Sequence, residues 1–335
     1  MNLTKKLCML AIPLALPFSN AFALSDGDTV RIVVPYSAGG GYDAQARLLT
    51  PYLKEELIAS GLDDVNVIVT NMTGGGGAIA TSNVYQAEGD GTTLLLLDPE
   101  TSLWQQTLSN PIFDLREFKY IAQQSADPLA FTIRKDLGVE DFDELVKRSS
   151  ETPVLMGTSG IGNHDHALPL VMEKMLNDHG VPLELEFLHL NGAGDILASM
   201  RRGEAESTLE VFSTFEKYVE DGNGEFLFVF GEDLSETLSS PTAKDTLGLP
   251  DEELRMLSAS ANFRRVYVAP PTTDDNTLST LREAFSRALS NPELVEKAVM
   301  SNRPIQYLDA AQIQQAIEEE ARLAERYGDY VKSQL

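Results

Sequence analysis

Short apolar segments, glycine-rich turns and amphipathic segments follow one another along the chain. Residues 29–36 (TVRIVVPY) are rich in β-branched side chains, which is typical of a buried strand, and lead into the glycines at 39–41. Helical spacing of apolar residues follows at 44–59, where Pro51 is expected to kink or divide the helix. A strand, a glycine turn and a helix in this order predict a crossover unit of an α/β fold.

The same order recurs along the chain. Further strands are expected at 65–70, 92–97, 154–157 and 185–188, and further helices at 78–86, 166–177 and 195–202. Strands that alternate with helices indicate a largely parallel sheet.

The length of the chain favours two lobes. Its 335 residues exceed the roughly 250–300 residues at which a single hydrophobic core stops growing. The apolar segment 131–133 is expected to cross to a second lobe, and 226–230 to return to the first. The expected organisation is a signal peptide at 1–23, a first lobe at 24–125 together with 232–335, and a second lobe at 126–231.

The N-terminus predicts export. Lys5 and Lys6 precede an apolar stretch at 7–18, and residues 21–23 (AFA) fit a signal-peptide cleavage site. Cleavage would remove Cys8, the only cysteine, so the mature chain is expected to form neither disulfides nor thiolate metal sites. The periplasm of a Gram-negative bacterium is the expected location.

The chain is strongly acidic. It carries 51 Asp and Glu against 26 Lys and Arg, which gives a net charge of −25. Because phosphate contacts require clustered Lys and Arg, this balance argues against nucleic acid as a partner. The acidic residues are spread along the chain, which favours a solvated surface, and attraction of a cationic ligand is the alternative.

The glycine turns favour anion binding by the main chain. Glycines let backbone N–H groups approach a ligand, and the N-terminus of the following helix carries a partial positive charge. The turns contain almost no basic residue, and Arg47 lies one helical turn beyond the first. Four such turns, two per lobe, follow strands on the side at which open α/β sheets bind ligands. A ligand anion is therefore expected to be held mainly by main-chain N–H groups and hydroxyls.

Residues 39–44 also fit the dinucleotide-binding pattern G-x-G-x-x-A after a strand. Asp63 and Asp64 precede the next strand, whereas the acid that binds a ribose follows it. This order argues against a nicotinamide cofactor. Asp43, in the same segment, has two interpretations: a partner of the helix dipole, or a group that orients a ligand hydroxyl, amine or bridging water.

The segment around His164 suggests metal binding or catalysis. His164 and His166 are two residues apart and point in different directions on a helix, so they do not chelate one ion. Ser159 with His164 and Asp165 suggests a nucleophile, but residues 157–161 depart from the G-x-S-x-G elbow. The expected role of His164 is that of a hydrogen-bond donor to a ligand or the backbone.

The chain resembles a known family. Residues 31–40 (RIVVPYSAGG), followed by Asp43 and Ala46-Arg47, are similar to the opening signature of the periplasmic substrate-binding proteins of tripartite tricarboxylate transporters, the Bug family. Asp98 and Glu100 stand where neutral small residues are commoner in that family. The resemblance covers nearly the whole mature chain and continues at Asn71 with 74–77, at 89–95, at 157–162 with His166, and at Ala269-Pro270.

The resemblance implies a type II periplasmic binding protein-like fold, in which two α/β lobes flank a hinge and an interlobe cleft. It implies a monomer, without cofactor, metal or catalytic residues, that closes on a di- or tricarboxylate or an aromatic carboxylate. The receptor would deliver this ligand to the large and small membrane subunits of the transporter. Carried over by position, the expected ligand-binding residues are Tyr36, Ala38, Gly39, Gly40, Gly41, Asp43, Gly75, Gly76, Thr158, Ser159, Gly160, Asn163, His164, Asn191 and Asp195.

Two other function classes remain open. The same fold would serve a sensor whose closed form is read by a membrane receptor instead of a transporter. A periplasmic hydrolase is the other class, and it would need a nucleophile or a metal.

Overall fold

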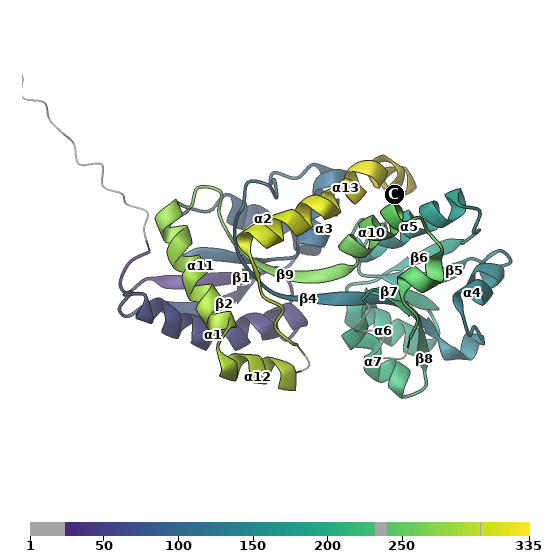
Figure 1. The fold of residues 1–335 in the computed structure, drawn as a ribbon, viewed down its shortest axis with the longest axis horizontal. Coiled ribbons are helices and arrows are strands. Elements are labelled where there is room, and N and C mark those ends of the chain that lie inside the picture. Colours follow the sequence, from purple (N-terminus) through teal and green to yellow (C-terminus); the bar gives the residue numbers. More distant parts are fainter. Residues whose placement is uncertain (1–23, 232–239, 302) are drawn as a thin grey trace, which may run out of the picture.

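The computed structural model describes residues 24–231, 240–301 and 303–335, which form two α/β lobes side by side (Figure 1). The expected signal peptide at 1–23 lies outside the described residues. Within these three ranges no helix combines the length and apolar character needed to cross a membrane.

The first lobe is built on strands in the order β2-β1-β3-β9-β4, here called sheet A. β1 (Thr29–Val34) is parallel to β2 (Asn66–Asn71) and to β3 (Thr93–Leu97). β9 (Asn262–Ala269) is antiparallel to β3 and to β4 (Lys119–Arg134), and the short β10 (Leu308–Asp309) also pairs with β4. The carboxyl ends of β1, β2 and β3 therefore lie at one edge of sheet A, where ligands of such sheets bind.

The second lobe is built on strands in the order β4-β7-β5-β6, here called sheet B. β5 (Val154–Thr158) is parallel to β6 (Leu185–His189) and to β7 (Ser207–Val211). The second half of β4 is antiparallel to β7 and to β8 (Gly224–Val229). The carboxyl ends of β5, β6 and β7 again share one edge.

β4 belongs to both sheets and joins the lobes. Its residues Lys119–Pro128 pair with β9 of sheet A, and its residues Leu129–Arg134 pair with β7 and β8 of sheet B. Figure 1 shows β4 and β9 running side by side between the two lobes. These two strands connect the lobes and are here called the hinge strands.

Helices surround both sheets. Those in the first lobe are α1 (Gly41–Ala59), α2 (Ala78–Tyr85), α3 (Pro99–Ser109), α11 (Asp275–Leu289), α12 (Pro292–Met300) and α13 (Ala310–Gln334). Those beside sheet B are α4 (Phe142–Ser149), α5 (His164–Asp178), α6 (Ala193–Arg202), α7 (Phe212–Glu220), α9 (Ala243–Leu247) and α10 (Asp251–Ser260). α13 contacts α3 and β4 and also α5 and α10, so it bridges the lobes (Figure 1).

β1 illustrates why sheet A is apolar on both faces. Ile32 and Val34 pack into one core with Leu49 of α1, whereas Val33 packs into the opposite core with Trp104 of α3. All five side chains are almost completely buried. A strand covered on both faces is expected to carry a continuous apolar run, and residues 32–34 (IVV) form such a run within the segment that was predicted from its β-branched residues.

Three expectations from the sequence need correction. Pro51 does not divide the first helix, because α1 runs through it from Gly41 to Ala59 and is anchored by buried leucines on both sides of the proline. The sheet is mixed and not largely parallel, since β4, β8, β9 and β10 run antiparallel to their neighbours. Residues 226–229 of the segment 226–230 lie in β8 of sheet B, and the chain rejoins sheet A at β9.

The expected lobe boundaries at 125/126 and 231/232 remain a proposal. The first lies close to the point in β4 at which pairing changes from β9 to β7 and β8. α9 and α10 follow the second boundary and contact β8 and α5, respectively.

Candidate functional site

The first glycine turn connects β1 to α1. Ala38, Gly39 and Gly40 are exposed, Gly39 has a φ of +84°, and Gly40 is the N-cap of α1. Gly41 is the first residue of the helix, so its N–H is one of the donors that no helical carbonyl accepts. The turn presents main-chain N–H groups at the positive end of a 19-residue helix.

Asp43 stabilises this turn from within. Its Oδ2 accepts a hydrogen bond from the Gly39 N–H at 2.8 Å, and Arg47 forms an ion pair with Oδ1 at 2.8 Å. The hydrogen bond from Arg47, assisted by the one from Gly39, lowers the pKa of Asp43 to about 2. Asp43 is therefore a carboxylate with partners inside the protein, in agreement with its interpretation as a helix-terminal residue.

A second glycine turn, Gly74 to Gly77, follows β2. All four glycines have positive φ, between +58° and +125°, a backbone region that residues with a Cβ atom rarely adopt. Gln105 of α3 donates hydrogen bonds from Nε2 to the carbonyl oxygens of Gly75 and Gly76, each at 3.0 Å. These bonds fix the turn against α3.

In the second lobe, residues 159–163 connect β5 to α5. The Ser159 N–H and Oγ both donate hydrogen bonds to Asp165, with an Oγ–Oδ1 distance of 2.8 Å. Asn163, the N-cap of α5, donates from Nδ2 to the carbonyl oxygen of Ser159 at 3.3 Å and to its Oγ at 3.2 Å. As in the first lobe, an aspartate in the first helical turn accepts a hydrogen bond from the preceding turn.

The turns of the two lobes meet. A Cβ atom added to Gly76 would lie 2.7 Å from Oδ1 of Asn163, and one added to Gly162 would lie 3.2 Å from Cδ1 of Leu108 in α3. The predicted residues Gly76 and Asn163, from opposite lobes, are therefore neighbours.

Three buried carboxyl groups lie near these turns. Asp98 is the N-cap of α3, Asp165 lies in α5 and Glu210 lies in β7, and each is at most 4% exposed. Burial raises the pKa of all three, to about 6 for Asp165, and the side chains of Asp165 and Glu210 share a hydrogen bond. Repulsion by Asp165 and by Asp98 raises the pKa of Glu210 further, so the cluster includes groups from both lobes.

Tyr36 links the first turn to this cluster. Its hydroxyl donates a hydrogen bond to Oδ2 of Asp98 at 2.5 Å, and its ring packs edge-on against Tyr42, with 4.8 Å between centroids. Tyr42 packs against Phe263 of β9 at 6.0 Å, and Phe263 against His164 of α5 at 6.3 Å. The four rings form a continuous row from the first lobe through the hinge strand to the second lobe.

His164 forms no catalytic pair with Ser159. Neither ring nitrogen of His164 has a hydrogen-bond partner within the described residues, and Oγ of Ser159 donates to Asp165 instead. Burial, reinforced by the nearby charge of Arg264, lowers the pKa of His164 to about 3, so its ring is neutral. His166 accepts a hydrogen bond from Gly162 at Nδ1, and the described part of the chain contains no cluster of three His, Cys, Asp or Glu that could hold a metal.

The fourth predicted turn follows β6 and has fewer contacts with the other turns. Thr158 is fully buried at the end of β5, and its Oγ1 hydrogen bonds with Nδ1 of His189 at 2.8 Å. Asn191 and Asp195 are exposed on either side of Gly192, the N-cap of α6. Of the expected residues at this edge, Thr158 is thus connected to β6, while Asn191 and Asp195 face solvent.

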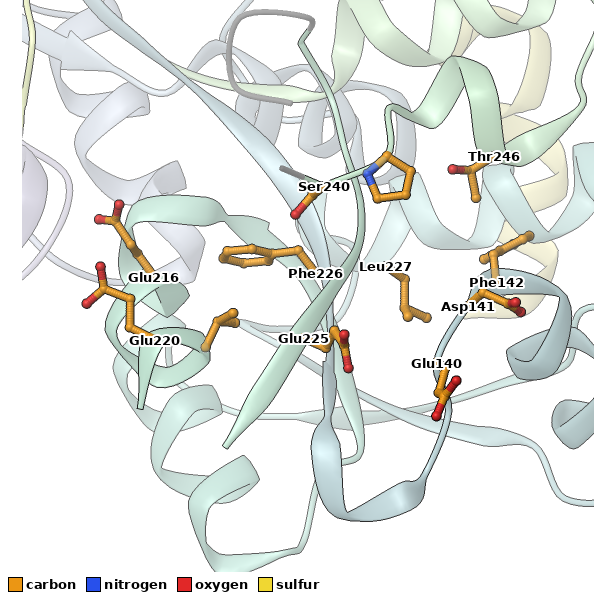
Figure 2. Close-up of a pocket in the computed structure, with 12 residues that line it drawn as sticks. Glu140, Asp141, Phe142, Glu216, Glu220, Glu225, Phe226, Leu227, Ser240 and Thr246 are labelled. Atoms are coloured by element: carbon orange, nitrogen blue, oxygen red, sulfur yellow. The ribbon is translucent and has the colours of Figure 1, made fainter. Parts of the chain in front are cut away.

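A cavity of about 480 Å³ lies elsewhere, on the second lobe beside α4, α7 and β8 (Figure 2). Its described lining contains no Lys or Arg, so it does not suit an anion. None of the predicted binding residues contributes to it. Five carboxylates line it, together with apolar side chains that include Phe226 and Leu227: Glu140, Asp141, Glu216, Glu220 and Glu225.

A model of the tripartite tricarboxylate transporter family receptor matches residues 57–332. The chain belongs to this family. The receptor is similar to Protein BugT of Bordetella pertussis, with 23% identity over 304 residues that cover 88% of each chain.

Solved structures of the same architecture confirm the expected fold class. MatC from Rhodopseudomonas palustris with bound malate gives a TM-score of 0.67 at 21% identity, covering 91% of this chain and 98% of that one. A second R. palustris protein, solved with adipate, gives a TM-score of 0.70 at 22% identity, covering 90% and 97%.

Sequence reasoning did not find every residue at the turns of this receptor. Asp98 was noted only as a departure from the family pattern, although its place directly after β3 is a signal that could have identified it. Tyr42 and Glu210 were not predicted. Glu210 lies in no recognisable sequence motif, because the pairing of β7 with β4 places it beside residues that are distant along the chain.

Proposed function

We propose that this receptor captures a small carboxylate between its lobes in the periplasm and delivers it to the membrane subunits of a tripartite transporter. The observation that carries the proposal is that a glycine turn of the first lobe, at Gly76, meets the turn before α5 of the second lobe, at Asn163. The first lobe also begins a long helix, α1, at its other glycine turn, and α1 and α5 each carry a partial positive charge at their N-terminus. Malate and adipate in the two related structures support a carboxylate ligand.

The proposed contacts come from both lobes. The first lobe contributes Tyr36, the turn at residues 38–41 and the turn at Gly75 and Gly76, with Asp43 as a support. Within the first turn the Gly39 N–H donates to Asp43 and the Gly40 N–H to the Ser37 carbonyl, so the N–H groups of Ala38 and Gly41 are the ones proposed to bind the ligand. The second lobe contributes Thr158, Ser159, Gly160, Asn163 and His164, and residues 191–195 lie at its outer turn.

Hinge closure is the proposed mechanism. Contacts from both lobes exist together only when the lobes are closed, so the ligand favours the closed state. Changing the ratio of open to closed receptor from about 99:1 to about 1:99 requires roughly 5.5 kcal/mol of differential binding. Hydrogen bonds to a charged group contribute about 1.5–3 kcal/mol each, so a few of them suffice.

A thermal-shift screen followed by titration calorimetry tests the proposal. Malate, adipate, citrate and benzoate are compared with lysine and with a polyamine, using the mature chain. A carboxylate present at about 100 times its Kd should stabilise the receptor by about 2.7 kcal/mol. A rise in Tm with the amines alone would contradict the proposal and would assign the acidic cluster to cation binding.

A variant pair locates the ligand. Gly40→Asp adds a carboxylate where the ligand anion is proposed to bind and should abolish binding by repulsion. Gly40→Ala, which adds only a Cβ atom 3.3 Å from the Ser37 carbonyl oxygen, is the uncharged control. Equal affinity of wild-type receptor and Gly40→Asp would remove the first turn from the site.

A further inference from the structure

Two consecutive arginines of the hinge strand β9 are buried but differ in their partners. Arg264 is 8% exposed and Arg265 is 7% exposed. Arg264 forms ion pairs with Glu100 and Glu320, donates from Nη1 to Glu100 at 2.8 Å and from Nη2 to the Ala259 carbonyl at 3.3 Å. Its guanidinium group is therefore occupied by structural partners.

Arg265 uses only one end of its guanidinium group in this way. Nη1 donates to Oγ of Ser125 at 3.2 Å and forms an ion pair with Asp127. Nε is buried without a hydrogen-bond partner among the described residues. Nε and Nη2 form the edge of the guanidinium group that matches the two oxygens of a carboxylate.

This edge lies against the start of α1. Nη2 is 3.3 Å from the position that a Cβ atom would take on Gly41, and the guanidinium carbon lies 4.8 Å from the centroid of the Tyr42 ring. The Tyr42 ring stacks with the guanidinium group and so limits its movement. Arg265 is thus held beside the first residues of the helix.

The position is electrostatically unusual for a structural arginine. A helix N-terminus carries about half a positive charge, and arginines are stabilised at the opposite end of a helix. Asp127 balances the charge of Arg265, and its attraction raises the pKa of Arg265 although burial acts in the other direction. A second anion is therefore favoured where the free edge of Arg265 and the helix N-terminus converge.

We infer that Arg265 binds a carboxylate group of the ligand through Nε and Nη2, together with the N–H groups that begin α1. This inference rests on the proposed function and adds a cationic side chain to a site expected from the sequence to be mainly main-chain. Asp98 and Asp127 lie near Arg265 and oppose a second negative charge at the same place. The site therefore selects a planar, singly charged carboxylate over a phosphate dianion.

Binding measurements on charge-altered variants test this role. The mature wild-type receptor, Arg265→Lys and Arg265→Gln are titrated with malate, adipate, citrate, benzoate and inorganic phosphate. Arg265→Lys keeps the positive charge but lacks the paired N–H donors of Nε and Nη2, so its carboxylate affinity should fall about tenfold to a hundredfold. Arg265→Gln also lacks the charge and should lose more affinity. Phosphate should not bind to the wild-type receptor.

Arg264→Gln is the matched control for stability. It also breaks buried ion pairs of β9, but it leaves the edge at α1 untouched, so it should lower Tm while keeping the carboxylate affinity within about twofold. Gly41→Ala provides a second test, because its Cβ atom displaces Nη2 without removing any ion pair and alanine favours the helix. Gly41→Ala should keep the wild-type Tm and bind the carboxylate more weakly.

The outcomes separate the inference from the proposed function. Carboxylate binding by the wild-type receptor with unchanged affinity in Gly41→Ala and Arg265→Lys overturns the role of Arg265 and leaves the proposed function standing. Absence of carboxylate binding by the wild-type receptor overturns both. Phosphate binding as tight as carboxylate binding overturns the selectivity.

Discussion

Buried carboxyl groups dominate the chemistry of this receptor at the scale of single residues. Asp98 accepts a hydrogen bond from Tyr36, Asp165 accepts one from Ser159, and Glu210 shares a hydrogen bond with Asp165. All three have raised pKa values because burial disfavours their charged forms. Asp43, which receives hydrogen bonds from Arg47 and Gly39, has a lowered pKa instead. The pKa of a carboxyl group in this receptor is thus raised by burial or lowered by hydrogen-bond donors, according to its surroundings.

The raised pKa values predict that the receptor becomes less stable as the pH rises from about 4 to about 7. The pKa of Asp165 is about 6 in the folded state, against roughly 3.9 in an unfolded chain, so the folded state binds more protons between these values. The stabilisation that comes from protonated Asp165 is fully present below about pH 4. It is lost as the pH rises through about 6. Thermal melts across this range measure it.

Glu210→Gln should weaken this pH dependence and raise Tm at pH 8, because the amide removes a charge that repels Asp165 and Asp98. Tm is expected to rise by about 2–4 °C for each kcal/mol of repulsion that the substitution removes. Glu151→Gln, at an exposed position, should leave the pH profile unchanged. Identical pH profiles for wild type and Glu210→Gln would contradict the assignment.

At the residue scale the sequence indicated local contacts but not distant ones. Gly39 and Asp43 are four residues apart, and the predicted order of strand, glycine turn and helix brings them together, so that the Gly39 N–H donates to Asp43. Arg265 reaches Gly41 only through the antiparallel pairing of β9 with β4. Pairing between strands so distant along the chain leaves no periodic signal in a single sequence.

At the scale of elements, local hydrophobic patterns predicted most strands and helices within a few residues. β5 was expected at 154–157 and is Val154–Thr158, and α2 was expected at 78–86 and is Ala78–Tyr85. The pattern could not show the direction of β9 or the length of β4, because both depend on how the two lobes share strands. Pro51 was misread for a related reason: packing on α1 compensates for an unfavourable local residue.

Close packing between elements predicts a strong effect of Gly89→Ala. Gly89 lies between α2 and β3, and a Cβ atom there would lie 2.3 Å from the backbone atoms of Thr272 and Thr273. Backbone cannot yield as a side chain does, so the variant should lose about 1–3 kcal/mol of unfolding free energy. Chemical denaturation measures this loss.

Gly194→Ala is the control for that measurement. Gly194 lies in the first turn of α6, and nothing lies within 4 Å of an added Cβ atom. Its replacement should be neutral or stabilising by up to about 1 kcal/mol. Equal stabilities of the two variants would show that the contact between Gly89 and the loop after β9 is not tight.

At the scale of the whole molecule, the net charge of −25 predicts a salt effect. Like charges repel one another across the compact state, and the range of this repulsion falls from about 30 Å at 0.01 M salt to about 3 Å at 1 M. Tm should therefore rise between 0.01 M and 0.5 M NaCl at pH 8. A fall in Tm would indicate that surface ion pairs outweigh the repulsion, and the rise should disappear near the isoelectric point.

The contact between the lobes at Gly76 and Asn163 predicts that a side chain added at Gly76 pushes the lobes apart. Asn is the side chain that best tolerates the left-handed region, so Gly76→Asn, at a φ of +59°, adds bulk toward α5 with little backbone strain. Asn163 and Gln105, which face this position, are held by hydrogen bonds to Ser159, Gly75 and Gly76, so they cannot move away without losing them. In the presence of a carboxylate that raises the Tm of the wild-type receptor, the lobes of the variant should stay further apart, and small-angle X-ray scattering should show a larger radius of gyration than for wild type.

Gly75→Asn separates this effect from backbone strain. Gly75 has a φ of +58°, but an added Cβ atom would meet only Ala78 at 3.5 Å and Ile79 at 4.0 Å, both on the same lobe. It should keep the wild-type radius of gyration, whereas Gly76→Asn should also weaken ligand binding in proportion to the lost fraction of closed receptor. If Gly76→Asn and Gly75→Asn have the same radius of gyration, the turns do not meet in solution. Closure must then bring the lobes together through other contacts. The contacts of α13 with α5 and α10 are the next ones to vary.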